Sequence, residues 1–253
     1  MRPEERYKKE SMKMLIKMIM FDLDGTLLPM DMEEFTGGYF KLLAKKMIAY
    51  GYETDKLVKS IWHGTGAMVK NDGRCSNEEA FWKDFAGIYG EQALKDIDVF
   101  NEFYAVDFDG ARQFCGFNEK AAQTVKWIKD KGIRVALATN PLFPSVATEK
   151  RIRWSGLEPD DFEFFTTYEN IGFCKPNPDY YREVLKRADM EAENCLMVGN
   201  DVGEDMVAEN LGMKVFLLTD CLINKDNADI ERYPHGGFDD LKKHIESITD
   251  IVL

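Results

Sequence analysis

Two aspartates stand one residue apart at the end of a short apolar run. The run MIMF at 18–21 is followed by Asp22 and Asp24, with a glycine and a threonine directly behind them. If the run continues as a strand, alternate side chains share a face, so both carboxylates point toward the same small volume. Like charges held together need a cation, a shared proton or a reacting group to offset their repulsion. The pattern therefore predicts a site of chemistry at this strand end.

Further polar residues follow the other strand-like runs of the chain. Apolar runs at 132–139, 162–167, 195–200 and 214–219 alternate with amphipathic helical patterns. This alternation predicts an α/β fold with a doubly wound parallel sheet, a Rossmann-like core. Ligands of such sheets bind beyond the carboxyl ends of the strands. The residues expected there, besides the two aspartates, are Thr139, Asn140, Lys175, Asp201 and Asp205.

A group of carboxylates with one lysine and one hydroxyl suits a particular chemistry. Hard oxygen ligands favour Mg²⁺, which takes one or two carboxylates and completes its shell with water and substrate phosphate. The ion and Lys175 would offset the repulsion between the carboxylates and bind the oxygens of a phosphoryl group. A carboxylate could then act as the nucleophile and form an acyl phosphate, which water hydrolyses.

Four ordered motifs carry a resemblance to a known family. DLDGT at 22–26, ATN at 138–140, CKPNPD at 174–179 and VGNDVGED at 198–205 are similar to the motifs of the haloacid dehalogenase superfamily, mostly phosphatases and phosphotransferases. DLDGT alone could be only a turn, because Asp-Gly is a strong turn signal. Four motifs in the right order make that interpretation a poor one.

The resemblance implies a role for each motif residue. It implies that Asp22 is the nucleophile and that Asp24 is the general acid and then the general base. It implies that Thr139 and Lys175 bind the phosphoryl group, with Asn140 beside them. The implied Mg²⁺ ligands are Asp22, the main-chain carbonyl of Asp24, and Asp201, with Asp205 in support. Gly-Asn-Asp stands where the family more commonly has Gly-Asp, so the division of metal roles between Asp201 and Asp205 stays open.

A long helical segment separates the first motif from the second. Residues 31–116 contain four stretches with apolar residues at helical spacing and almost no strand signal, and 107–118 is expected to be a linker back to the core. By resemblance, this helical insertion is a cap domain. The expected division is a core of 1–30 and 117–253 and a cap of 31–116. Trp62, Phe81 and Trp82 are expected to form the core of the cap, and the alternative is that they form a platform for the substrate.

One loop of the helical insertion could face the substrate. Ser76 and Glu79 form a capping-box pattern, so 70–75 should be a loop that enters a helix. The loop carries Lys70 and Arg74, which we predict to contact an anionic substrate. The alternative is that both cations lie on a solvated turn.

Composition restricts the classes of function. The chain of 253 residues has a formal net charge of -12, which argues against nucleic acid as a partner. The longest apolar run, at 14–21, is interrupted by Lys17, so no membrane span is expected. Residues 1–13 lack the clean apolar stretch of a signal peptide and are expected to be an extension before the first strand. Five scattered cysteines without a C-x-x-C pair are typical of a reducing cytoplasm.

The expected function is a Mg²⁺-dependent phosphatase that acts on a small phosphorylated metabolite through an aspartyl phosphate. A sugar phosphomutase of the same superfamily is the nearest alternative, and it differs in passing the phosphoryl group to a sugar hydroxyl. Dehalogenases and phosphonatases fit less well, since they lack an acid equivalent to Asp24. A phosphate-binding regulatory protein without turnover is the alternative from another class. The oligomeric state and the identity of the substrate are left open.

Overall fold

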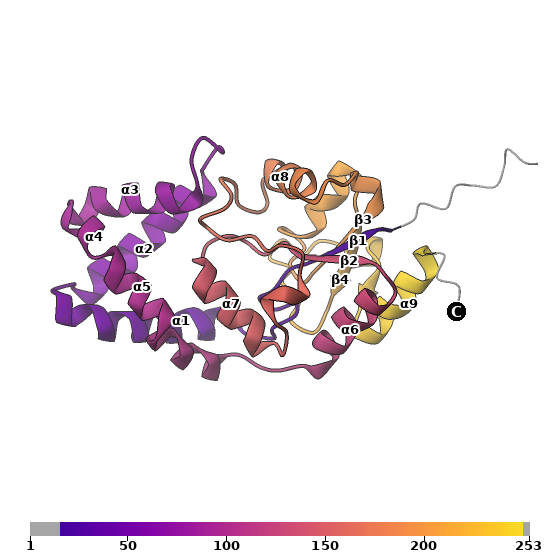
Figure 1. Ribbon diagram of the computed structural model, residues 1–253, viewed down its shortest axis with the longest axis horizontal. Helices are drawn as coiled ribbons and strands as arrows, with labels where there is room; N and C mark the ends of the chain where they lie inside the picture. The colour runs from indigo at the N-terminus through magenta and orange to yellow at the C-terminus, as the bar shows by residue number, and fades with distance from the viewer. Residues whose placement is uncertain (1–15, 250–253) are drawn as a thin grey trace, which may run out of the picture.

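The computed structural model describes residues 16–249 and has a parallel sheet at its centre (Figure 1). The expected extension at 1–13 lies outside the described residues. The strands are β1 (Met18–Phe21), β2 (Arg134–Leu137), β3 (Cys195–Gly199), β4 (Lys214–Leu218) and β5 (His235–Gly236). They pair in the order β2-β1-β3-β4-β5, and every pairing is parallel. The predicted α/β fold with a parallel sheet is therefore confirmed.

The central strand β1 faces a different hydrophobic core on each side. Ile19 and Phe21 belong to one core, and Met18 and Met20 belong to the other. The first core takes in α6 (Glu119–Asp130), α7 (Ser145–Trp154) and α9 (Phe238–Ile248), and the second takes in α8 (Pro178–Ala188) and the 3-10 helix η7 (Met206–Leu211). Helices thus cover both faces, as in a doubly wound fold. A strand buried on both faces explains why its sequence is apolar without alternation.

The helix boundaries follow the capping signals in the sequence. Asn118 caps α6 by accepting a hydrogen bond from the backbone N–H of Lys120. Asn177 caps α8 in the same way, with Pro178 as the first helical residue. Both starts agree with these residue types, because Asn accepts from the free N–H groups of a first turn and Pro lacks one.

The apolar run at 162–167 was expected to be a strand, and this prediction was wrong in detail. It forms one isolated parallel bridge, between Leu137 and Phe165, on the free edge of β2. Backbone hydrogen bonds from Glu163 N to Val135 O and from Leu137 N to Phe164 O still tie it to that edge. The segment therefore extends the sheet without becoming a regular strand.

The helical insertion forms one end of the elongated molecule, and the sheet lies toward the other end (Figure 1). Its helices are α1 (Met32–Met47), α2 (Thr54–Val69), α3 (Asn77–Tyr89), α4 (Gln92–Lys95) and α5 (Ile97–Ala105), with the 3-10 helices η3 (Ile48–Tyr50) and η4 (Asp107–Phe114). The expected linker at 107–118 thus begins as helix. Met30 and Cys115 form an antiparallel bridge, and Gly116 N donates to Pro29 O at 2.7 Å. The two chain connections run side by side here, which supports our proposed boundaries of 30 and 117.

The start of α3 anchors the helical insertion to the core. Asn77 is fully buried, and its Nδ2 lies 3.2 Å from the carbonyl oxygen of Phe173 and 3.3 Å from Sγ of Cys174, next to Lys175. Its Oδ1 accepts from Nδ2 of Asn71 at 2.9 Å. The capping box predicted for Ser76 is present at the same helix start. One amide therefore joins the loop of the insertion to the segment that carries the site lysine.

No helix within residues 16–249 has both the length and the apolar character needed to cross a membrane.

We predict that Asn77→Ala destabilises the protein by about 1–3 kcal/mol, because it leaves buried backbone and amide groups without their partners. Urea unfolding of the variant measures this change. Asn101→Ala, on the exposed side of α5, is the control and should change the free energy of unfolding by less than about 0.5 kcal/mol. Equal stabilities of the two variants would contradict an anchoring role for Asn77.

Candidate active site

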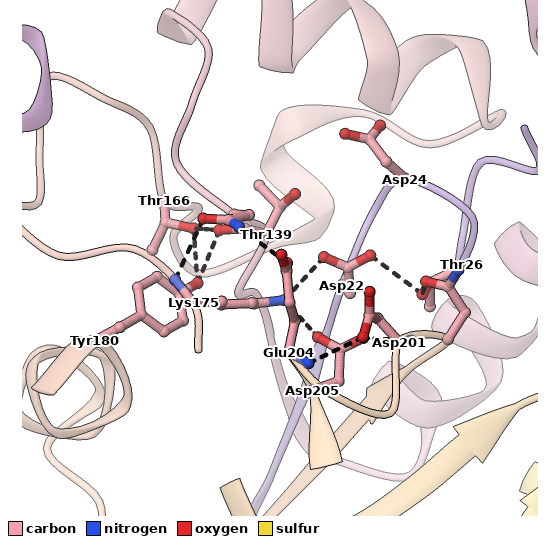
Figure 2. A network of polar contacts seen from close by, with 12 residues as sticks. Asp22, Asp24, Thr26, Thr139, Thr166, Lys175, Tyr180, Asp201, Glu204 and Asp205 are labelled. Carbon is pink, nitrogen blue, oxygen red and sulfur yellow. Dashed lines mark hydrogen bonds and ion pairs between the residues drawn. The ribbon is translucent and has the colours of Figure 1, made fainter. Parts of the chain in front are cut away.

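Asp22 is the first residue after β1 and lies at the centre of a polar network (Figure 2). Its backbone N–H still bonds to Val198 O of β3 at 2.9 Å, so the sheet fixes its position. The side chain is nearly buried, and Oδ1 accepts from Nζ of Lys175 at 2.9 Å. Oδ2 lies 3.2 Å from Oγ1 of Thr26. Both carboxylate oxygens are therefore held in defined directions.

Lys175 is a buried cation between two carboxylates. Its Nζ donates to Asp22 Oδ1 at 2.9 Å and to Asp205 Oδ1 at 2.6 Å, and the side chain is 1% exposed. Burial alone would lower the pKa of Lys175, but the charges of Asp205 and Asp22 raise it well above its usual value. The lysine therefore stays charged at the bottom of the site.

Thr139 and Asn140 come from the chain just beyond β2. The carbonyl oxygen of Thr139 accepts from Oγ1 of Thr166 at 2.6 Å and from the hydroxyl of Tyr180 at 2.8 Å. Asn140 Oδ1 accepts from the backbone N–H of Lys175 at 3.3 Å, and its Nδ2 donates to Glu204 at 2.9 Å. Thr139 is thus fixed through its backbone, which leaves its hydroxyl for a ligand of the cavity it lines.

The chain beyond β3 supplies the last acidic pair. Asp201 Oδ1 accepts from the backbone N–H groups of Gly203 and Glu204 at 2.7 and 3.0 Å. Asp205 is 1% exposed, and its two oxygens bind Lys175 Nζ and the backbone N–H of Asp201. Asp205 therefore holds the lysine and the Asp201 loop, and its support of a metal site stays a prediction.

The donor atoms at this edge fit a hard divalent cation. Within residues 16–249, no three His, Cys, Asp or Glu side chains converge closely enough to hold an ion by themselves. Mg²⁺ does not require that, since it binds proteins through one or two carboxylates and keeps several waters. Asp22 and Asp201 line the same cavity, and Figure 2 shows their carboxylates beside each other. Two carboxylates and a main-chain carbonyl form a suitable set for this ion.

Asp24 lies apart from the network around Asp22. The strand ends at Phe21, so the alternation expected to bring both carboxylates to one face does not continue through Asp24. Both residues line the same cavity, but Figure 2 shows the carboxylate of Asp24 turned away from Asp22. Asp24 Oδ2 instead forms an ion pair with Nη1 of Arg151.

Arg151 is a fully buried residue of α7 and was not anticipated from the sequence. Besides Asp24, its guanidinium contacts Oγ1 of Thr148 at 3.2 Å and lies 4.4 Å from the ring centre of Phe143. The segment ATEKRIRW carries several charges and resembles a surface helix. The spacing of Ala147, Thr148 and Arg151 along one helix face was the signal that could have placed the arginine inward.

The pKa of Asp24 is under opposing influences from its surroundings. Burial raises the pKa of Asp24 above its usual value, and Arg151 only partly opposes this, while the charge of Asp22 adds to it. Its Oδ1 is buried and has no hydrogen-bond partner among the described residues. Glu204, a second residue that the sequence interpretation missed, has its pKa raised to about 7 by burial.

A cavity of about 1180 Å³ joins the polar network to the helical insertion. Trp62, Phe81 and Trp82 all line it. Phe81 and Trp82 are also buried in the hydrophobic core, as expected, whereas the expectation was wrong for Trp62, which is 54% exposed. Lys70 and Arg74 are not among the lining residues, and Arg74 is exposed and paired with Asp72 at 2.8 Å. Their contact with substrate stays a prediction to which this arrangement adds no support.

Comparison with known proteins gives the family. The family model for haloacid dehalogenase-like hydrolases matches residues 16–212, which is most of the chain. The chain belongs to the haloacid dehalogenase-like hydrolases. This assignment agrees with the four motifs and with the carboxylate–lysine network.

Two curated relatives are phosphatases. The chain is 26% identical to a phosphoglycolate phosphatase of Pseudomonas savastanoi pv. phaseolicola, covering 94% of this chain and 81% of the relative. It is 27% identical to a glyceraldehyde 3-phosphate phosphatase of Methanothermobacter thermautotrophicus, covering 86% and 92%. A solved 2-haloacid dehalogenase from Pseudomonas syringae pv. tomato has a TM-score of 0.60 at 21% identity, covering 92% and 99%, and shares the fold. The chain is an enzyme of this hydrolase family, and its relatives support action on phosphoric monoesters.

The ion pair between Arg151 and Asp24 can be tested by a double-mutant cycle. We predict that Arg151→Met lowers the free energy of unfolding at pH 7 by about 3–5 kcal/mol, because it leaves a buried carboxylate without its partner. The double variant Asp24→Asn/Arg151→Met should recover part of this loss, since the amide carries no charge. Urea unfolding of all variants measures the coupling.

Arg153→Met is the control for this cycle. Arg153 is two residues further along α7 and forms exposed ion pairs with Glu149 and Glu158. Pairs of that kind contribute about 0–1 kcal/mol. If Arg151→Met were no more destabilising than Arg153→Met, the pair would not be important for the structure.

Proposed function

We propose that the protein is a Mg²⁺-dependent phosphatase that hydrolyses a small phosphate monoester through a phosphoryl group on Asp22. The observation that carries this proposal is the arrangement of Asp22. One of its oxygens is fixed 2.9 Å from a permanently charged lysine, and the residue lies at the floor of a cavity that also contains Asp24 and Thr139. A fixed carboxylate beside a cation and a potential proton donor is the arrangement that nucleophilic phosphoryl transfer needs.

In the first step a carboxylate oxygen of Asp22 attacks phosphorus and forms an acyl phosphate. The bond from phosphorus to the substrate oxygen breaks at the same time, and the leaving alkoxide takes the proton of Asp24. Lys175 and the hydroxyl of Thr139 bind the phosphoryl oxygens and stabilise their charge. The raised pKa of Asp24 supports its part, because an acid must hold its proton until the leaving group needs it.

In the second step water hydrolyses the acyl phosphate. Asp24, now a carboxylate, accepts a proton from the water as the oxygen attacks phosphorus. The bond between phosphorus and Asp22 then breaks, which releases inorganic phosphate and restores the nucleophile. One residue thus serves both proton transfers, with opposite direction in each.

Mg²⁺ would be held by Asp22, Asp201 and the main-chain carbonyl of Asp24. When bound, it supplies positive charge against the phosphoryl oxygens and against the repulsion among the carboxylates. Asp201 suits this part, because the backbone holds its Oδ1 and no hydrogen bond to its Oδ2 is formed by the described residues.

The carboxylate of Asp24 has to turn toward Asp22 during turnover. It is paired with Arg151 and directed away from the network in this structure (Figure 2). A rotation of the Asp24 side chain would break its contact with Arg151 and bring its carboxyl group to the leaving group. We propose that Arg151 holds the acid in place between reaction cycles.

We predict that Asp22→Asn lowers kcat by about 10³-fold or more while the fold is kept, since the amide preserves the shape but removes the nucleophile. Release of inorganic phosphate from a panel of phosphorylated metabolites measures turnover, and circular dichroism checks the fold. Asp226→Asn, at an exposed position outside the cavity, is the matched control and should retain full activity. Substantial turnover by the Asp22 variant would assign the nucleophile elsewhere. A rearranged phosphosugar without phosphate release would identify a mutase.

The proposed metal dependence predicts that a chelator abolishes phosphate release and that added Mg²⁺ restores it. Ca²⁺ should not restore activity, because it accepts more ligands at longer distances and could engage both oxygens of Asp22. Asp201→Asn should raise the Mg²⁺ concentration needed for half-maximal activity by about tenfold or more. Full activity in chelator would overturn the proposed cofactor.

A further inference from the structure

The wall of the cavity contributed by the helical insertion is aromatic. Side chains from α1, α2, α3 and α5 line it, and they include Tyr39, Phe40, Trp62, Trp82, Phe100 and Tyr104. Several of these rings pack edge to face. The ring centroids of Phe40 and Trp62 are 5.5 Å apart, and those of Trp82 and Phe100 are 5.2 Å apart. The wall is therefore packed and presents ring surfaces to whatever binds above the phosphoryl site.

The same wall has no cation to bind an anionic leaving group. The charged residues of the helical insertion that line the cavity are Asp31 and Glu33, both negative. The basic residue among the lining side chains is Lys225, which belongs to the chain beyond β4 and not to the insertion. A carboxylate on the leaving group would meet two negative charges of the insertion and no cation of the insertion, which is unfavourable.

Arg151 does not supply a counterion for an anionic leaving group. It is not among the lining residues, and its charge is already paired with Asp24. Lys70 and Arg74 also lie outside the lining. Among the described residues, the helical insertion therefore offers no counterion for a second charge on the substrate, and Lys225 is the basic side chain in the lining of the cavity.

A pair of tyrosine hydroxyls gives this wall one polar feature. The hydroxyl oxygens of Tyr39 and Tyr104 are 2.7 Å apart, so one hydrogen closes this bond. Burial raises the pKa of both groups, so both keep their protons. The hydroxyl hydrogen that is not used in this bond has no acceptor among the described residues. It can be donated to an uncharged acceptor atom of a bound substrate.

We infer that the substrate is a phosphate monoester with an uncharged, aromatic or largely apolar leaving group, an inference that rests on the proposed phosphatase function. The volume agrees with it. Ligand cavities usually measure about 300–1000 Å³. The volume of this cavity, about 1180 Å³, exceeds that range and leaves room for a ring above the phosphoryl group. A polar leaving group of only two or three carbon atoms would be too small to cover the aromatic wall, which would stay in contact with water.

The wild-type enzyme tests this inference directly. Benzyl phosphate, glycerol 3-phosphate and 2-phosphoglycolate are compared by kcat/KM with saturating Mg²⁺. All three release alkyl alcohols, so the comparison does not depend on the better leaving group of an aryl ester. We expect benzyl phosphate to exceed both others by about tenfold or more, which is the discrimination that an apolar contact provides.

Two variants separate contact with the wall from general damage. Trp62→Ala should lower kcat/KM for benzyl phosphate by about tenfold and change that for glycerol 3-phosphate by less than about twofold. Tyr50→Ala, an exposed aromatic of the insertion outside the cavity, is its control. Thr65→Lys adds a cation to the wall and should move the preference toward 2-phosphoglycolate, whereas Val69→Lys, one turn away and outside the lining, should not.

The outcomes separate the two proposals. If no ester releases phosphate under any condition, the proposed phosphatase function fails. If the enzyme turns over but prefers 2-phosphoglycolate or glycerol 3-phosphate, or if Trp62→Ala reduces all substrates equally, the function stands and the inferred leaving group is overturned.

Discussion

The structure depends on one buried cation, the ammonium group of Lys175. It holds Asp22 at 2.9 Å and Asp205 at 2.6 Å, and these three groups come from three separate parts of the chain. Without the lysine, two carboxylates would be buried together without compensation, which is among the costliest arrangements in a protein interior. The parallel pairing of β1 and β3 brings the chain after each strand to the same edge of the sheet, where Asp22 and Asp205 both reach Lys175. The fold thus brings the three charged groups together at one edge of the sheet, where we propose that the reaction takes place.

Much of the core could be predicted from local sequence because its signals act over a few residues. Asn118 and Asn177 cap their helices through their own side chains, and a run such as that of β1 is apolar because both of its faces are buried. The motif residues follow strand ends, and parallel strands bring their carboxyl ends to one edge. The segment at 162–167 shows the limit, because an apolar run at the free edge of a sheet need not complete a regular strand.

The parts that could not be predicted depend on contacts between distant residues. Arg151 is in a charged segment that suggests a solvated helix, and only the folded structure shows that its side chain is buried and paired with Asp24. Alternation along a strand suggested that Asp22 and Asp24 point together, whereas the chain leaves the strand after Phe21 and separates them. The aromatic residues of the helical insertion could be recognised as apolar, but the sequence does not say which rings pack inward and which line a cavity.

The core and the helical insertion line the cavity with different kinds of side chain. The core supplies nearly all of the charged groups at the phosphoryl site, and the helical insertion supplies apolar surface together with two acidic residues. This division strengthens the chemistry, because apolar walls exclude water and so increase the effect of Lys175 on a bound phosphoryl group. Burial also raises the pKa of Asp24 above its usual value, a direction that suits the proton donor we propose it to be. In the proposed mechanism the aromatic wall would therefore contribute in two ways, by contacting the leaving group and by excluding water from the phosphoryl site.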